Sequence, residues 1–404
     1  MRQIVKSGLY LRLVLISSSI LFLVAFIGCS EGDNATGSLA PAIVDFTPTH
    51  GLADTIVTIT GNNFSTTPED NVVQFNGTTA VVSRSTPTQI VTTVPQGATS
   101  GPITVTVNGL TATSATDFFV SGAIVTTWTL EASGTLENLL GLVFGGGQHI
   151  AVGSGGKIFT SPEAVMWTER YSGTLQILHS VIFDGRVYIA VGAQGTVLTS
   201  PDGFAWERRT SGTTQILYDV AYGNNQLVAV GSAGTILTST TDFPDSDDIG
   251  STWVRQNSGT LENLIGVAFD GEQYIAVGNG GIIITSPDGF LWTQRASGTI
   301  RNLHSIAFDG EGYLAVGAGG TIVTSLDGVA CREIYSGTLK ILYDVIYAND
   351  QFFAVGSDGT IITSFDGVTW IDGSSGVKDW LRRIEFNGER FVIAGENGTI
   401  LGSD

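Results

Sequence analysis

Residues 190–206 read AVGAQGTVLTSPDGFAW, and nearly the same wording returns at 276–292 (AVGNGGIIITSPDGFLW) and at 354–370 (AVGSDGTIITSFDGVTW). The tryptophans that close these phrases belong to a longer series with a spacing of 39 residues, which eight inserted residues interrupt once. The series is Trp128, Trp167, Trp206, Trp253, Trp292 and Trp370, with Cys331 at the position before the last. A fixed period of roughly 40 residues indicates a repeat architecture.

Each repeat unit contains four short apolar runs separated by turn residues. In the second unit the runs are LHSVIF (178–183), YIAVG (188–192), TVLTS (196–200) and AWERR (205–209). Asp-Gly and Gly-containing turns between such runs are hairpin signals, because glycine adopts the positive φ that tight turns need. Four-stranded meanders repeated seven times predict a seven-bladed β-propeller over residues 128–404.

The first and last units are incomplete in complementary ways. The first begins with an isolated strand of the fourth type, WTLEA (128–132), and the last ends after its third strand, GTILGSD (398–404). We therefore expect the N-terminal strand of the propeller to complete the last blade and close the ring, which removes exposed sheet edges.

The recurrent SxDGxxW phrase resembles the Asp-box hairpin of sialidase-type propellers, although it is one residue short. That resemblance implies a structural role, with Asp and Ser bonding the turn and the aromatic ring packing between sheets. The wider AVGxxGTIxTS wording is also similar to repeats of the photosystem II assembly-factor family and of bacterial surface propellers. The phrase is therefore interpreted as a building block rather than as a catalytic motif.

Residues 41–120 differ from the repeats and consist of short β-branched runs between turn clusters, a pattern typical of a small β-sandwich. Several segments in order resemble an IPT/TIG domain. They are FTPTHG (46–51), VTITGNNF (57–64), VVQFNGTTA (72–80), VPQGATSGPITVTV (94–107) and FFV (118–120). The resemblance implies an immunoglobulin-like fold that serves as a spacer or contact module. Residues 121–127 are then a linker, and the chain as a whole is predicted to be all-β.

Residues 1–28 have a basic start followed by the apolar run LVLISSSILFLVAFIG (13–28), which suits a signal peptide. The ending FIGC (26–29) resembles the lipobox of bacterial lipoproteins, which implies cleavage before Cys29 and lipidation of its sulfur. An ordinary signal peptide or an N-terminal anchor helix is the alternative. Residues 29–40 would then be a lipidated tether. Ser30 in the second position favours the outer membrane over the inner membrane.

Acidic residues dominate the predicted mature chain. Without residues 1–28 it keeps 15 of its 18 Lys and Arg against 37 Asp and Glu, a net charge of −22. Such a charge repels nucleic acid, so no nucleic-acid partner is expected. With Cys29 lipidated, Cys331 has no cysteine to pair with in the chain.

The candidate binding residues open the innermost strand of the repeats. They are His179, Tyr218, Asp219, His304, Tyr343, Asp344 and Arg382. They should surround one mouth of the central channel, with ordinary polar filling of the channel as the alternative. The His and Tyr-Asp pairs occur twice because units 1–3 resemble units 4–6. If the imidazoles keep their usual pKa of about 6.5, binding at the mouth is expected to change between about pH 5 and 8.

Other candidate sites carry weaker signals. The insertion at 241–251 holds Asp242, Asp245 and Asp247, which could bind calcium weakly, and a solvated acidic loop is the alternative. Cys331 stands at a packing position and is interpreted as buried and inert. A sialidase-like enzyme would need three arginines on the substrate carboxylate, and the arginines of the repeats fall mostly on outer strands.

These observations predict a non-enzymatic, membrane-anchored lipoprotein of the cell envelope, monomeric and without cofactor. Its propeller is expected to bind a protein or glycan. The alternatives are an assembly or maturation factor for an envelope complex and, third, a sialidase-like glycan-active enzyme.

Overall fold

The computed structural model describes residues 39–120, 127–240 and 250–403. Within these ranges the chain forms β-strands and short 3-10 turns, so the all-β prediction is confirmed. No helix in the described ranges is long and apolar enough to cross a membrane. The signal segment, Cys29 and the candidate calcium residues Asp242, Asp245 and Asp247 lie outside the described residues.

The first part is an immunoglobulin-like sandwich of two sheets. One sheet has the order β1 (Ala42–Thr47), β3 (Ile56–Asn62), β7 (Gln89–Thr93), β6 (Val82–Thr86). The other has the order β2 (His50–Gly51), β9 (Leu110–Val120), β8 (Gly101–Val107), β4 (Asn71–Phe75), β5 (Thr78–Ala80), and η1 spans Pro68–Asp70. Strand β8 buries every second residue, as expected for a strand with one face on a core. Ile103, Val105 and Phe118 are fully buried in that core.

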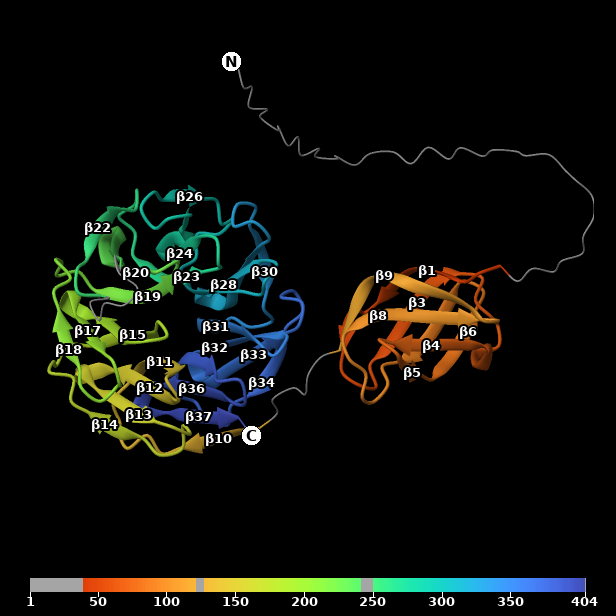
Figure 1. Ribbon diagram of the computed structural model, residues 1–404, viewed down its shortest axis with the longest axis horizontal. Helices are drawn as coiled ribbons and strands as arrows, with labels where there is room; N and C mark the ends of the chain where they lie inside the picture. Colours follow the sequence, from red (N-terminus) through yellow and green to blue (C-terminus); the bar gives the residue numbers. More distant parts are fainter. Residues whose placement is uncertain (1–38, 121–126, 241–249, 404) are drawn as a thin grey trace, which may run out of the picture. The chain divides into compact units, whose positions relative to one another are not determined.

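The second part contains seven four-stranded sheets among the described residues, each a meander arranged around a centre (Figure 1). The innermost strands are β11 (Leu139–Gly145), β15 (Leu178–Phe183), β19 (Leu217–Gly223), β23 (Leu264–Phe269), β27 (Leu303–Phe308), β31 (Leu342–Ala348) and β35 (Leu381–Phe386). The second strands are β12 (Gln148–Gly153), β16 (Tyr188–Gly192), β20 (Gln226–Gly231), β24 (Tyr274–Gly278), β28 (Tyr313–Gly317), β32 (Gln351–Gly356) and β36 (Phe391–Gly395).

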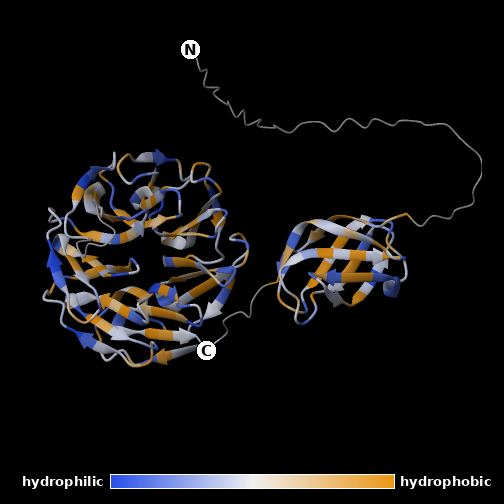
Figure 2. Ribbon diagram, in the orientation of Figure 1, coloured by the Kyte–Doolittle hydropathy of each residue, from blue (hydrophilic) through white to orange (hydrophobic). Residues whose placement is uncertain are grey.

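The third strands are β13 (Ile158–Ser161), β17 (Val197–Ser200), β21 (Thr235–Thr240), β25 (Ile283–Ser286), β29 (Thr321–Ser325), β33 (Thr360–Ser364) and β37 (Ile400–Ser403). The outer strands are β14 (Thr168–Arg170), β18 (Glu207–Arg209), β22 (Val254–Asn257), β26 (Thr293–Arg295), β30 (Arg332–Tyr335), β34 (Ile371–Ser374) and β10 (Trp128–Glu131). Most residues of the outer strands are hydrophilic, and hydrophobic residues concentrate on the strands inside them (Figure 2). The four strands predicted for the second unit match β15 to β18 within two residues at each end.

The ring closes because the first strand of the propeller joins the sheet formed by its last three strands. Strand β10 pairs antiparallel with β37, from Trp128 opposite Ser403 to Glu131 opposite Ile400. Arg390 Nη2 on the same sheet lies 3.2 Å from Glu131 Oε1. Strand β37 therefore has a partner on both sides.

The repeated SxDGxxW turn has a structural role, in which hydrogen bonds fix the turn and the tryptophan packs against the blade. In the second unit the Asp202 carboxylate accepts hydrogen bonds from the backbone of Phe204 and Ala205, which lower its pKa. Trp206 Nε1 donates to the Gly203 carbonyl at 3.0 Å, while its ring packs partly buried against the blade core. The equivalent donation recurs at Trp167, Trp253, Trp292 and Trp370. Cys331, predicted to be buried, is only half-buried, and burial raises the pKa of its thiol.

Candidate functional site

Two kinds of connection share one end of the propeller, which we call the loop face. The antiparallel meander places the 3-10 turn between the second and third strands at the same end as the loop that leads to the next sheet. Hydrogen bonds join the two directly, from Gly195 N to Gln215 O at 2.8 Å and from Asn279 N to Asn263 O at 2.9 Å. The seven turns are η2 (Ser154–Gly156), η3 (Ala193–Gly195), η4 (Ser232–Gly234), η5 (Asn279–Gly281), η6 (Ala318–Gly320), η7 (Ser357–Gly359) and η8 (Glu396–Gly398).

A Ser-Gly-Thr sequence, replaced by Ser-Gly-Val at 375–377, fixes the shape of the seven connecting loops. Ser211 Oγ donates to the Gly195 carbonyl at 2.6 Å and accepts the Thr213 amide. Gly195 has φ +61°, and a Cβ there would lie 2.0 Å from Thr213 O, so the close approach requires glycine. The residue after the threonine lies at the tip of the loop and is exposed to solvent. Five of these tip residues are aliphatic and 79–89% exposed: Leu136, Leu175, Leu261, Ile300 and Leu339.

A hollow of about 500 Å³ lies at the channel mouth on the loop face. Its lining includes five of the predicted residues, namely His179, Tyr218, His304, Tyr343 and Arg382. Leu140 and Ile265 occupy the equivalent position in two other sheets, so the hollow has mixed apolar and polar walls. The structure thus brings together side chains up to about 200 residues apart in sequence, because the first residues of the inner strands meet at the channel.

His304, Tyr343 and Arg382 form one side of the hollow, and they belong to a stack that continues to Trp380 beside the lining. Tyr343 stacks on His304 at 5.6 Å and on Trp380 at 5.7 Å between ring centroids. The Arg382 guanidinium carbon lies 4.0 Å from the Tyr343 centroid and 5.1 Å from that of Trp380. Glu396 forms an ion pair with Arg382. Sequence reasoning missed Trp380 as a site residue, and its signal was its departure from the repeat pattern.

The other side repeats part of this arrangement. His179 and Tyr218 meet edge to face at 5.3 Å, as expected from the internal duplication. Burial lowers the pKa of His179 to about 4, with Arg383 and Arg382 adding to the effect. Burial also lowers the pKa of His304, whose Nδ1 lies 2.9 Å from the Leu342 carbonyl. Both imidazoles are therefore neutral above pH 6.5, and the expected change in binding between pH 5 and 8 is wrong for His179.

Asp219 and Asp344, predicted at the mouth, do not line the hollow. They are 7% and 3% exposed and lie one residue further along their strands, where side chains point to the other side. Asp219 accepts hydrogen bonds from Ser180 Oγ at 2.7 Å and from Val267 N at 3.0 Å. Asp344 does the same with Ser305 and Ile384 N, so neither aspartate is paired with a histidine for catalysis.

Arg383, which also lines the hollow, connects these two aspartates. Its guanidinium lies 2.8 Å from Asp219 and 3.3 Å from Asp344. Burial opposes the charge on Arg383, but the two carboxylates outweigh it and raise its pKa. Burial raises the pKa of Asp344, which Arg383 partly offsets. The aspartates are parts of a buried ion network that supports the mouth from below.

The two ends of the propeller differ in charge. The hairpin end, which we call the turn face, has only Arg186 and Arg390 in its described turns against a large set of carboxylates: Glu163, Asp184, Asp202, Asp270, Glu272, Asp288, Asp309, Glu311, Asp327, Asp350, Asp366 and Glu389. The loop face balances Lys157, Arg301, Lys340, Lys378 and Arg382 against Glu137, Glu262, Asp358, Asp379 and Glu396. Within the described residues no group of three metal-ligating side chains converges. The loop face is therefore the more neutral end.

Comparisons with known proteins agree with this architecture. Residues 41–120 match the family model of the IPT/TIG domain, which confirms that resemblance. No curated protein matches the chain. Its fold is similar to that of YCF48 from Cyanidioschyzon merolae, with 21% identity and a TM-score of 0.56, covering 68% of this chain and 98% of that chain.

Two further solved structures are similar. One is YCF48 bound to D1 peptide, with 19% identity and a TM-score of 0.58, covering 70% of this chain and 96% of that chain. The other is a catalytically inactive virginiamycin B lyase from Staphylococcus aureus with Quinupristin, with 13% identity and a TM-score of 0.59, covering 68% and 98%. At these identities the likeness shows the fold alone, a β-propeller.

Proposed function

We propose that this chain is a non-enzymatic, lipid-anchored protein of the cell envelope whose seven-bladed propeller binds a protein or glycan at the loop face. The observation that carries the proposal is the hollow at the channel mouth, whose lining residues Tyr343 and Arg382 stack with the adjacent Trp380. Rings held in place by one another lose little entropy when they bind a partner. Ligand sites of propellers and other folds are typically such concave, mostly apolar hollows.

The charge balance of the mouth favours a neutral ligand group. Arg382 is already paired with Glu396, and Arg383 with Asp219 and Asp344. The neutral imidazoles of His179 and His304 add hydrogen-bonding capacity without charge. An uncharged side chain of a partner protein, or a neutral sugar, meets these requirements.

A protein partner is our first choice. The related fold YCF48 has been solved with a D1 peptide bound, which supports peptide binding by this architecture. An assembly or maturation factor for an envelope complex is the alternative form of the same idea. A glycan-active enzyme comes third, because Asp219 and Asp344 serve Arg383 rather than a reaction centre.

The anchor rests on the FIGC ending and Cys29. In this proposal lipid holds the N-terminus at the membrane, most simply the outer membrane, and the IPT/TIG domain spaces the propeller from it. Replacing Cys29 by Ser should abolish incorporation of labelled fatty acid and release the protein from membranes. Ser30→Ala serves as the control. A Cys29→Ser protein that is still labelled and membrane-bound would contradict the anchor.

The mouth is tested with residues 40–404, which form one compact unit. Peptide and glycan arrays are probed with this fragment and with Tyr343→Ala/Trp380→Ala. Tyr335→Ala, which removes a 76% exposed tyrosine from an outer strand, is the control. We expect the double variant to lose signals that the control retains. Equal signals from all three proteins would show that binding does not depend on the mouth. Conversion of an arrayed glycan would show enzymatic activity. Either result would reject the proposal.

A further inference from the structure

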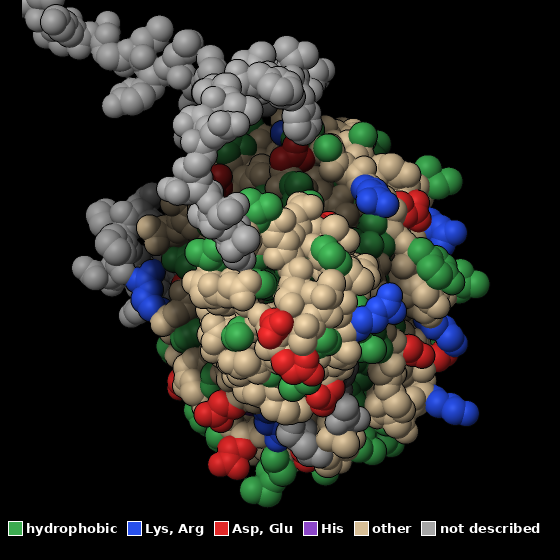
Figure 3. Space-filling view, turned by 90° about the vertical axis from the view of Figure 1, so that its right-hand side faces the viewer, with side chains coloured by type: hydrophobic (Ala, Val, Ile, Leu, Met, Phe, Trp, Pro, Cys, Tyr) green, Lys and Arg blue, Asp and Glu red, His purple; other side chains and the backbone are tan. Residues whose placement is uncertain are grey.

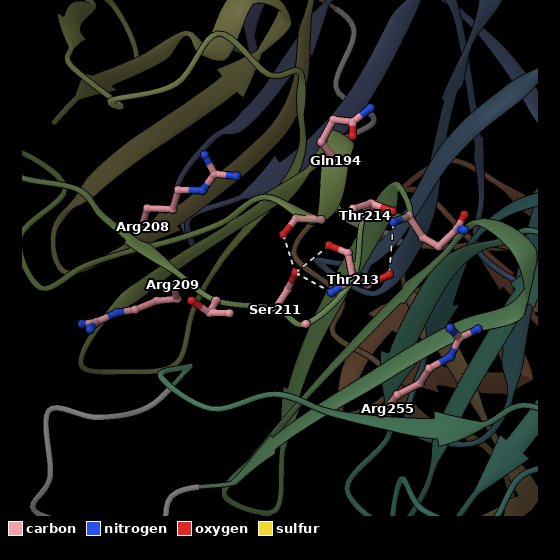
Figure 4. A pocket seen from close by; sticks show the side chains of 11 residues that line it. Gln194, Arg208, Arg209, Ser211, Thr213, Thr214 and Arg255 are labelled. Atoms are coloured by element: carbon pink, nitrogen blue, oxygen red, sulfur yellow. Dashed lines mark hydrogen bonds between the residues drawn. The ribbon is translucent and has the colours of Figure 1, made fainter.

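A second hollow, of about 630 Å³, lies at the rim of the loop face between two neighbouring sheets. Its lining consists of polar and small residues around the loop Ser211–Gln215, together with Arg208, Arg209 and Arg255 (Figure 4). No carboxylate belongs to the described lining. In a chain with about twice as many acidic as basic residues, a hollow with three arginines and no acid needs an explanation.

The arginines do not all have the same role. Arg209 Nε donates to Thr199 Oγ1 at 2.8 Å, and the same bond is made by Arg170 to Thr160 and by Arg295 to Thr285. Arg209 also pairs with Glu207 at 3.1 Å. It therefore belongs to the common framework of the blades.

Arg208 and Arg255 depart from that framework. Both occupy one register position, opposite Leu198 and opposite Leu237, on the outer strands of consecutive sheets. The same position elsewhere holds Leu130, Glu169, Gln294, Glu333 and Asp372. Only these two adjacent sheets carry arginine there, both side chains are exposed, and neither forms an ion pair within the described residues.

The loop between the two arginines is altered as well. Thr214 stands at the tip position that is aliphatic in five other loops. The equivalent hollows at other blade junctions include carboxylates, Glu262 in one and Glu131 and Asp379 in another. At this junction alone, among the hollows compared, both the apolar tip and the acidic groups are replaced.

We propose that this hollow binds an acidic polysaccharide, a sugar chain that carries carboxylate or sulfate groups. Arg208 and Arg255 lie on opposite sides of the Ser211–Thr214 loop (Figure 4), so two charges on one chain fit them better than a single small ion. Guanidinium groups pair with carboxylate and sulfate oxygens in a bidentate manner. Gln194, Thr214 and the loop backbone offer hydrogen bonds to hydroxyl groups, and the lining has no apolar side chain that would hold a peptide side chain.

The test measures binding of residues 40–404 to polygalacturonate, dextran sulfate, neutral dextran and poly-glutamate by calorimetry at low and high salt. We expect the two acidic polysaccharides to bind and neutral dextran not to bind. Binding should weaken strongly on raising NaCl from about 50 to about 300 mM, since the arginines are exposed to solvent. Arg208→Gln and Arg255→Gln should each weaken binding several-fold, and the double variant at least tenfold.

Arg332→Gln is the matched control, because it removes one exposed arginine from an outer strand of another sheet. It should leave the affinity unchanged. Absence of binding at low salt, equal loss in the control, or full affinity in the double variant would overturn the proposal. Equal binding of poly-glutamate would also overturn it and identify an acidic peptide as the ligand. The mouth variants leave Arg208 and Arg255 intact, so the two proposals fail independently.

Discussion

Arg383 on strand β35 lies 2.8 Å from Asp219 on strand β19, although 164 residues separate them in the chain. The same guanidinium reaches Asp344 on β31, so three sheets are joined across the channel. Each aspartate in turn accepts the backbone amide of the next inner strand, Val267 for Asp219 and Ile384 for Asp344. Arg383 is thus the shared counter-ion of two buried carboxylates.

Removing Arg383 should therefore destabilise the propeller strongly. Arg383→Met leaves Asp219 and Asp344 buried without a counter-ion, which costs about 3–5 kcal/mol of the free energy of unfolding. Urea denaturation of residues 40–404 measures this loss. Arg382→Met, at the partly exposed mouth, should cost about 1 kcal/mol. If Asp219→Asn/Asp344→Asn does not reduce the cost of Arg383→Met, the network does not act as one unit.

The repeat made the fold predictable, but not the division of the inner-strand residues between mouth and channel. A spacing of 39 residues and Asp-Gly turns were sufficient for the strands of each sheet. The prediction placed both Tyr218 and Asp219 at the mouth, although neighbouring strand residues point to opposite sides. That signal was available in the sequence and would have moved Asp219 and Asp344 into the channel.

Ring closure gives a second prediction. Deleting residues 128–131 removes β10 and leaves β37 as an exposed edge with Arg390 unpaired. The variant should melt at a lower temperature and aggregate on standing, because an unpaired edge offers backbone groups to other chains. Calorimetry and light scattering follow both effects. Glu131→Gln, which keeps the strand, should lower the melting temperature far less. If the deletion variant melts at the same temperature as the parent, the strand does not close the ring.

The acid stability of the propeller should depend on His179. Its pKa is lowered to about 4 by burial and by Arg383 and Arg382, whereas an unfolded histidine titrates near 6.5. Between these values the unfolded chain binds more protons than the folded one, so stability falls as pH falls. We expect His179→Gln to recover about 2 kcal/mol of the loss between pH 7 and pH 5. Parallel stability curves for parent and variant would contradict the lowered pKa.

The role of Trp380 and of the Arg208 and Arg255 pair could not be derived from composition or period. Their significance depends on which side chains from other sheets stand beside them. Arg382 becomes part of a stack because Tyr343 of the preceding sheet and Trp380 lie against it. Arg208 and Arg255 stand out only when the strand register is known, because other sheets have acidic or neutral residues at the same register position. A sequence shows which residues depart from a repeat, but it does not show which side chains of other sheets lie beside them.

The exposed loop tips provide the last prediction, because they distinguish a protein partner from a small glycan. On the face that the space-filling view presents, hydrophobic side chains lie scattered among polar and charged ones (Figure 3). The tips surround the mouth at equivalent positions of the repeats, and the Ser-Gly-Thr turns hold them rigidly.

Replacing Leu136, Leu175 and Leu261 by serine should leave the melting temperature nearly unchanged, since these side chains are 85–86% exposed. A partner protein that covers the loop face should then bind at least about tenfold more weakly, because each leucine contributes on the order of 1 kcal/mol when buried. Leu326→Ser is the matched control, as Leu326 is 80% exposed in a hairpin of the turn face. Titration of partner peptides and proteins recovered from the arrays measures the effect. Unchanged affinity of a protein partner in the triple variant would restrict binding to the mouth and remove the tips from the interface.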